Sequence, residues 1–157
     1  MDMTHSIEVR EIPAVSVAYK TKTISQSEIG NTFMSVLPAV FQFVVENGCQ
    51  IAGAPFGRYP AWRESDCDMD AGVPFIGNLV TTDDILIGTL GGFSAAVLSY
   101  YGPYEGIHSA HGECHQWLAQ NGYQVSGAPC ELYLTDPTTE PDCNKWLTEI
   151  VWPVEKA

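Results

Sequence analysis

Apolar residues recur every three or four positions in two long stretches of the chain. The first stretch carries them at Ile29, Phe33, Val36, Leu37, Val40, Phe41 and Val44, and the second at Ile107, Ala110, Cys114, Trp117 and Leu118. This spacing places the apolar side chains on one face of a helix. We predict a first helix that begins at a capping box formed by Ser25 and Glu28 and a second helix over Tyr104–Gln120. Each ends at an Asn-Gly pair, 47–48 and 121–122, because glycine readily adopts the left-handed conformation found there.

Segments rich in β-branched and aromatic residues surround both helices and predict strands. They are Ile7–Lys20, taken as one long strand bent at Pro13, followed by Ile51–Tyr59, Val73–Val80, Ile85–Tyr101 (a strand pair or a bent strand), Tyr123–Leu134 and Trp146–Val154. The acidic run at residues 64–70 and the Pro-rich, acidic segment 135–144 are expected to be solvated loops.

One sequence pattern occurs twice. Residues 47–59 read NGCQIAGAPFGRY and residues 121–133 read NGYQVSGAPCELY, 74 positions apart. A repeat period of about half the chain indicates two copies of one supersecondary unit. We therefore expect an α+β fold with a duplicated β-α-β-β unit: a single domain over residues 1–157, with halves at about 1–81 and 82–157. Its antiparallel sheet would carry two helices on one face and a ligand cleft on the other.

The charge composition narrows the classes of partner. The chain has 157 residues, of which 19 are Asp or Glu and 7 are Lys or Arg, which gives a formal net charge of −12. Such a surface repels phosphate backbones and anionic membranes and attracts cations, so we expect no direct binding of nucleic acid or membrane. The amino terminus lacks the pattern of a signal peptide, and the five cysteines show no CxxC spacing. These features favour a cytoplasmic protein with reduced thiols.

Several motifs resemble one known family. They are GPYEGI at 102–107, WLAQNGY at 117–123, GAPCELYLTDP at 127–137, TEIVWPV at 148–154 and DMDAGVPF at 68–75. Together they resemble the GyrI-like domain, the effector-binding module of many AraC-type and MerR-type regulators, here in what would be a stand-alone form. The resemblance implies binding of bulky cationic or aromatic compounds around a glutamate on a strand.

The candidate glutamate is Glu131, which stands where the first copy of the repeat has Gly57. Strand alternation places Glu131 and Tyr133 on the same face, and we expect this to be the open face, away from the helices. Tyr59, the repeat partner of Tyr133, would line the same site. A carboxylate surrounded by aromatic rings suits a lipophilic organic cation. The alternative is an exposed strand glutamate beside a structural tyrosine.

Three further residues are weaker candidates for binding the ligand. Glu149 could reach the same concavity as Glu131 or face solvent at a sheet edge. Tyr104, at the start of the second helix, and Trp62 could line the pocket, although aromatic residues at such positions often serve core or rim packing.

The second helix also carries His108, His111, Cys114 and His115, which at first suggest a metal site. The HExxH signature is absent, however, and the first-copy counterparts of these four positions are apolar core residues. We expect tolerated imidazoles on a helix flank, with no metal and no cofactor. No serine or cysteine lies in the sequence context of a catalytic nucleophile.

Three functions remain for comparison with the structure. The leading one is capture of a hydrophobic, cationic aromatic molecule in a cleft between the two halves, for sequestration or sensing, by a protein that could form a homodimer. The first alternative is a hydrolase of cyclopropanoid-type electrophiles, with Glu131 as general base and Tyr133 or Tyr104 polarising the substrate carbonyl. The second alternative is an acidic inhibitor of a DNA-acting enzyme such as gyrase, which requires carboxylates clustered on one exposed face.

Overall fold

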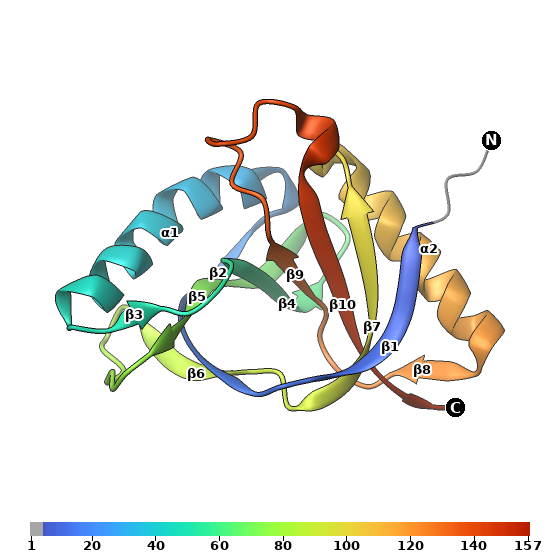
Figure 1. Cartoon of the computed structure of the whole chain (residues 1–157), viewed down its shortest axis with the longest axis horizontal. Helices are drawn as coiled ribbons and strands as arrows, with labels where there is room; N and C mark the ends of the chain where they lie inside the picture. Colours follow the sequence, from blue (N-terminus) through green and yellow to red (C-terminus); the bar gives the residue numbers. More distant parts are fainter. Residues whose placement is uncertain (1–4) are drawn as a thin grey trace. The chain divides into compact units, whose positions relative to one another are not determined.

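Pro13 and the pair Gly91-Gly92 lie where the backbone passes from one structural unit to another. The computed structural model describes residues 5–157. Unit 1 contains the described residues up to Ile12 together with Phe93–Ala157, and unit 2 contains Pro13–Gly92. The boundaries therefore differ from a division near residue 81, because each unit includes a strand from the other half of the sequence (Figure 1).

Unit 2 is an antiparallel sheet with one helix. The strands are β2 (Val15–Ser25), β3 (Gln50–Ile51), β4 (Phe56–Trp62), β5 (Asp66–Ile76) and β6 (Leu86–Leu90). They pair in the order β4-β5-β2-β6, and β3 pairs with the end of β5. A short 3-10 turn, η1 (Gln26–Glu28), leads into α1 (Ile29–Glu46).

Unit 1 repeats this arrangement. Its strands are β1 (Ser6–Ile12), β7 (Phe93–Tyr101), β8 (Tyr123–Val125), β9 (Cys130–Tyr133) and β10 (Leu147–Lys156), and its helix is α2 (Ile107–Asn121). The 3-10 turns η2 (Tyr104–Gly106) and η3 (Cys143–Lys145) precede α2 and β10. The sheet order is β1-β7-β10-β9, all antiparallel, and β8 pairs with the end of β10. Both units thus confirm the predicted α+β class and the duplication.

The predicted long strand Ile7–Lys20 is wrong, because it is two strands that belong to different units. β1 pairs with β7 in unit 1, whereas β2 pairs with β5 and β6 in unit 2. Figure 1 shows β1 in blue beside β7 in yellow. Pro13 lies between β1 and β2, and a proline, which has no N–H, cannot donate to a continuous ladder. Of the two alternatives for Ile85–Tyr101, the structure has two strands, β6 and β7, which pair with other strands and belong to different units.

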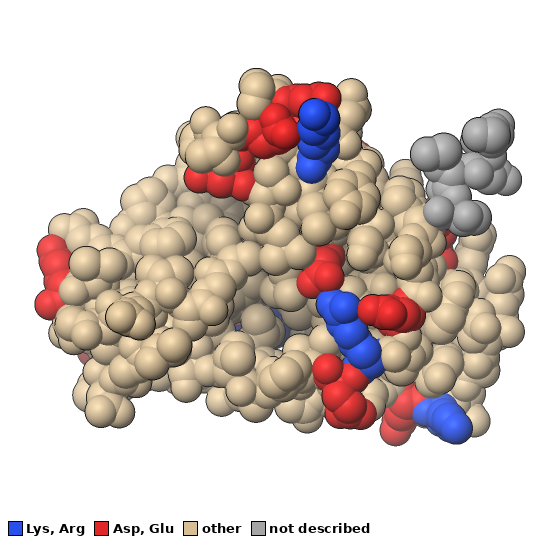
Figure 2. All heavy atoms as spheres, viewed as in Figure 1, with Lys and Arg blue, Asp and Glu red and all other residues tan. Residues whose placement is uncertain are grey.

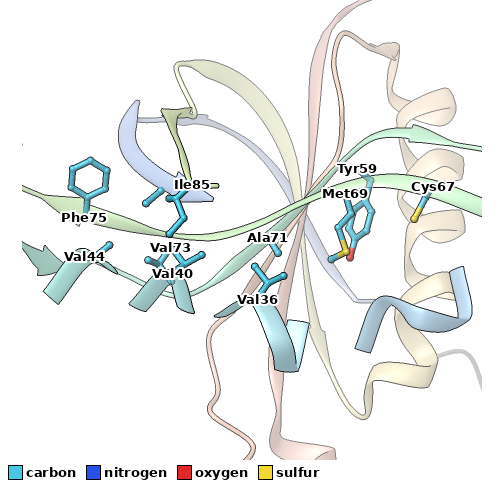
Figure 3. Close-up of a cluster of buried hydrophobic side chains, with 11 residues drawn as sticks. Val36, Val40, Val44, Tyr59, Cys67, Met69, Ala71, Val73, Phe75 and Ile85 are labelled. Carbon is cyan, nitrogen blue, oxygen red and sulfur yellow. The ribbon is translucent and has the colours of Figure 1, made fainter. Parts of the chain in front are cut away.

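The helix of each unit buries its apolar stripe against the sheet. Val36, Val40 and Val44 of α1 face Met69, Ala71 and Val73 of β5 in the core of unit 2 (Figure 3). In unit 1, the predicted stripe of Ile107, Ala110, Cys114 and Leu118 is buried against Ala96, Leu98 and Ile150. Both helices end where the Asn-Gly pairs predicted, and Gly48 and Gly122 have φ angles of +75° and +77°.

Two local predictions are wrong. Ser25 makes no side-chain cap to the helix backbone, because its hydroxyl lies 3.0 Å from the Ser27 hydroxyl instead. The acidic run at residues 64–70 is largely strand, since β5 begins at Asp66. Alternation along β5 buries Cys67 and Met69 and places the aspartates on the opposite face.

The aspartates of β5 are compatible with a strand because neighbouring donors partner them. The Arg58 guanidinium donates to Asp70 Oδ2 at 2.8 Å, and the Thr21 hydroxyl donates to Asp70 Oδ1 at 2.7 Å. Arg63 donates to both Asp66 and Asp68. The acidic residues alone suggested a solvated loop, because the donors that pair with them lie outside that run of the sequence.

One helical segment, Gln26–Glu46, meets the length and composition of a membrane span, with a mean hydropathy of 1.3. By itself the finding is weak, since core helices of water-soluble folds meet the same criteria. In unit 2 the segment packs its valines on β5 as a sheet-covering helix does.

Close approach of two strands makes Gly72 a sensitive position. A Cβ atom at Gly72 would lie 2.0 Å from the Ala18 carbonyl oxygen, so the backbone of β2 would have to shift. We expect Gly72→Ala to lower the free energy of unfolding by roughly 1–3 kcal/mol, measured by denaturant titration. As a control, Gly112→Ala in α2 meets no atom within 4 Å and should raise it by about 0.5–1 kcal/mol. Equal stability of the Gly72→Ala variant and the wild type would contradict the close approach of Gly72 to the backbone of β2.

Candidate functional site

Glu131 lies on the face of the unit 1 sheet that α2 covers. Its partner in the register is Ile150, which packs in the core beneath α2, and adjacent residues of paired strands point to the same side of a sheet. Glu131 and Tyr133 share a face of the sheet, as predicted. That face is the one covered by α2, however, and not the open face that the sequence analysis expected. The prediction assumed that the apolar residues of β9 meet the helix, whereas the polar residues do.

Four side chains from three elements form a continuous hydrogen-bonded network around Glu131. The Tyr133 hydroxyl donates to Glu131 Oε1 at 2.6 Å, and His111 Nε2 lies 2.7 Å from Glu131 Oε2. The Trp152 indole N–H donates to His111 Nδ1 at 2.9 Å. Glu131 itself is 8% exposed. We refer to Glu131, Tyr133, His111 and Trp152 as the Glu131 network.

The hydrogen bonds determine the protonation state of the His111 ring. An indole N–H can only donate, so His111 Nδ1 must accept and carries no proton. The ring is then the neutral tautomer, with its proton on Nε2, which donates to Glu131. Glu131 accepts from a donor at each oxygen, which suits an ionised carboxylate.

Aromatic rings extend outward from the network. The Tyr104 ring lies 5.9 Å from the Tyr133 ring and 5.1 Å from the Trp146 ring, between centroids. On the other side, the His115 ring packs on Trp152 at 4.4 Å. Burial raises the pKa of the Tyr104 hydroxyl, and Asp136 adds to the shift. Burial also lowers the pKa of His115.

Thr148 places an unpaired hydroxyl close to the network. It lies on β10, opposite Tyr133 on one side and Tyr100 on the other, and it is fully buried. Its position two residues before Ile150 puts it on the same sheet face as Glu131. Among the described residues its Oγ1 has no hydrogen-bond partner, which is costly for a buried hydroxyl.

The duplication shows that the fold does not require the network. In unit 1, Glu131 pairs with Ile150, and in unit 2 its repeat partner Gly57 pairs with Ala71. Trp152, two residues after Ile150, therefore corresponds to Val73, two residues after Ala71. The repeat spacing matches His111 with Leu37. Val73 is fully buried and Leu37 packs against the same apolar cluster. One copy of the unit is therefore apolar where the other carries a glutamate, a histidine and a tryptophan.

The other predicted ligand contacts are placed as follows. Tyr104 lies beside Tyr133, as described above. Glu149 is opposite Leu132 in the register, on the sheet face away from Glu131, and it accepts a hydrogen bond from Arg10 at 2.9 Å. Glu149 and Glu131 therefore do not line one surface of the unit 1 sheet.

Tyr59 and Trp62 belong to unit 2, where their rings contact one another edge-on at 5.7 Å. Tyr59 is 6% exposed and packs in the apolar cluster, whereas Trp62 is 50% exposed. Their roles as ligand contacts remain predictions.

His111 and Trp152 are the site residues that the sequence did not reveal. His111 was expected to be a tolerated imidazole on the flank of α2, yet it turns toward Glu131. Among residues 5–157, no group of three or more His, Cys, Asp or Glu side chains is arranged to hold a metal ion. The available signal was the repeat itself, because His111 and Glu131 both replace nonpolar residues of the first copy.

Comparison with known families gives a match over nearly the whole chain. The sequence profile described as "GyrI-like small molecule binding domain" matches residues 5–155. No protein of curated function matches the sequence at a significant level.

Solved structures share the fold at low sequence identity. The C-terminal domain of EcmrR is 23% identical, with a TM-score of 0.87 over 99% of this chain and 100% of that domain. In the EcmrR–DNA complex, this chain spans 59% of the EcmrR polypeptide. SAV2435 bound to tetraphenylphosphonium is 16% identical, with a TM-score of 0.66 over 98% of this chain and 94% of that one. A hydrolase from Listeria innocua is 14% identical, with a TM-score of 0.63 over 97% and 93%.

The unpaired hydroxyl of Thr148 gives a stability test of the site. Thr148→Val keeps the shape and removes the buried polar group, so we expect the free energy of unfolding to rise by about 1 kcal/mol. Thr135 is the control, because its Oγ1 accepts from the Leu147 N–H at 2.9 Å, and Thr135→Val should lower stability instead. Chemical denaturation measures both. Destabilisation by Thr148→Val would mean that the hydroxyl is hydrogen-bonded in solution.

Proposed function

Because this chain belongs to the GyrI-like small-molecule-binding domain family, we propose that it captures a lipophilic, cationic aromatic molecule at the Glu131 network. The observation that carries the proposal is the charge balance at Glu131. The carboxylate is buried, and among residues 5–157 it forms no ion pair with a lysine or arginine. Its two donors are Tyr133 and a neutral His111, so the negative charge remains available to a ligand.

Burial makes that charge a strong site for a cation. An uncompensated buried charge costs several kcal/mol, and a bound cation recovers part of this cost. The rings of Tyr133, Tyr104 and Trp146 supply apolar area and cation–π attraction. The formal net charge of −12 increases the local concentration of cations. SAV2435, which shares the fold, was solved with the lipophilic cation tetraphenylphosphonium, and this supports the choice of ligand class.

Capture of the ligand would serve sequestration or sensing. EcmrR, whose C-terminal domain shares the fold, was solved in a complex with DNA. In that protein, a domain of this fold is therefore part of a longer chain that was found with DNA. For this chain we retain the expectations of a cytoplasmic protein that binds no nucleic acid directly, and of a possible homodimer.

Hydrolysis of a cyclopropanoid-type electrophile is the second candidate. A buried, hydrogen-bonded glutamate can act as general base toward water, and one structure of similar fold is a hydrolase. Tyr133 already donates its hydroxyl to Glu131, so Tyr104 is the better placed of the two tyrosines to polarise a substrate carbonyl.

Inhibition of a DNA-acting enzyme receives less support. That function needs a continuous surface of carboxylates, whereas some carboxylates here pair locally with arginine, as Asp70 does with Arg58 and Glu149 with Arg10. Figure 2 shows small groups of acidic side chains with basic side chains set among them on the visible face.

The Glu131→Gln variant tests the charge requirement. Titration with a fluorescent rhodamine-type cation should show binding weakened by about 2–5 kcal/mol, or roughly 30-fold to several-thousand-fold, because the ligand loses its charge partner. Glu149→Gln is the control, since it removes an acid from the opposite face of the same sheet, and its affinity should match the wild type. Thermal melting of each variant separates loss of binding from loss of folding. Equal affinity of Glu131→Gln and wild type would refute the proposal.

The aromatic wall has its own test. Tyr104→Leu removes the ring that contacts Tyr133 and Trp146, and we expect dye affinity to fall by about 0.5–2 kcal/mol, or roughly 2- to 30-fold. Tyr101→Leu is the control, because Tyr101 is 61% exposed. A Tyr104→Leu variant that binds as tightly as the control would assign Tyr104 to rim packing.

A further inference from the structure

Resting on the proposed function, we infer that Trp152 sets the charge of the ligand site by holding His111 neutral. The indole N–H of Trp152 occupies His111 Nδ1, the atom that would have to take up a proton to form imidazolium. The Glu131 network consequently carries one negative charge. Trp152 is a positioning residue in this role and need not touch the ligand.

The inference follows from what a histidine beside a carboxylate ordinarily does. A nearby negative charge favours the protonated imidazole, and the resulting pair of His111 and Glu131 would have no net charge. Such a site would hold a cationic ligand weakly, because the histidine would already neutralise the glutamate. A donor at Nδ1 opposes this outcome, since a hydrogen bond made to the neutral form of a group disfavours its charged form.

The groups that face His111 support the same charge state. Glu131 approaches it from β9 and Trp152 from β10, and His115, on the next turn of α2, packs on the same Trp152 ring. Of these, Glu131 alone favours a positive charge on His111. Trp152 is a neutral hydrogen-bond donor, and burial lowers the pKa of His115, which favours its uncharged form. Among the described residues, no lysine or arginine forms an ion pair with Glu131 beside His111.

The same residues specify what a substitute for His111 must provide. The position needs an acceptor toward Trp152 and a donor toward Glu131, without any group that can take up a proton. A glutamine side chain has an amide oxygen and an amide NH2 and does not titrate. His111→Gln should therefore retain the negative charge of the site at every pH at which Glu131 is ionised.

The test compares ligand binding at different pH values in three variants and the wild type. Tetraphenylphosphonium is the probe, because its charge is independent of pH, and calorimetry measures its affinity between about pH 6 and 8, the range in which an imidazole changes charge. We expect a flat profile for the wild type. Trp152→Phe keeps an aromatic ring but frees His111 Nδ1, so its affinity should fall about tenfold or more as the pH is lowered through this range.

Two controls isolate the role of the indole N–H. Trp117→Phe changes a tryptophan of α2 that stacks on Tyr123, outside the Glu131 network, and its profile should stay flat. The double variant His111→Gln, Trp152→Phe should also be flat, because the group that titrates has been removed. A wild-type profile as steep as that of Trp152→Phe, or a flat profile for Trp152→Phe, would overturn the inference.

A measurement without ligand separates this inference from the proposed function. Nitrogen-15 NMR of the histidine rings in the wild-type protein reports directly which ring nitrogen of His111 carries a proton. We expect a neutral ring protonated on Nε2 at about pH 7. A doubly protonated ring would overturn the inference even if Glu131-dependent binding were observed. A neutral ring in a protein that binds no cation would support the charge assignment and refute the proposed function instead.

Discussion

The rest of the site depends on the burial of one carboxylate, Glu131, which pairs with no lysine or arginine among residues 5–157. Glu131 lies beneath α2, where an ionised group is costly unless donors surround it. Tyr133 and His111 supply those donors, and Trp152 in turn fixes the His111 ring. Each of these contacts is neutral, so the negative charge is stabilised without being cancelled. This separates the site from an ordinary buried ion pair, whose charges are satisfied within the protein.

The duplicated unit explains how the fold carries such a site. In unit 2 the corresponding positions hold Leu37, Gly57 and Val73, and the helix packs on an apolar surface. Two copies of one arrangement, one apolar and one with a polar network, show that stability of the unit does not require the polar side chains. The polar copy is the one at which we propose binding, because perturbed polar groups cluster at functional sites.

The electrostatics of the molecule separate the remaining acids from this site. Arg58 is paired with Asp70, and Arg10 with Glu149, both on sheet faces opposite the helices. Both pairs balance charge locally; the Arg10–Glu149 pair is partly exposed and contributes little to stability, whereas Asp70 is buried beside its arginine. Asp70 is as deeply buried as Glu131, at 6% and 8% exposed, so Glu131 differs from these acids in its partners, none of which is an arginine or lysine among residues 5–157. The large negative charge of the chain therefore does not by itself locate the binding site, although it favours the approach of a cation.

The sequence by itself determined the two helices, the residues at which they end and the duplication, and it singled out Glu131 as a candidate. These depend on local periodicity, on glycine at helix ends and on a repeat that can be aligned by eye. It did not determine which face Glu131 occupies, because alternation shows which residues share a face but not what covers it. Tertiary structure alone brought Trp152 to His111 across 41 positions and paired β1 with β7. Such contacts arise from strand pairing between distant segments, and no local pattern in the sequence encodes them.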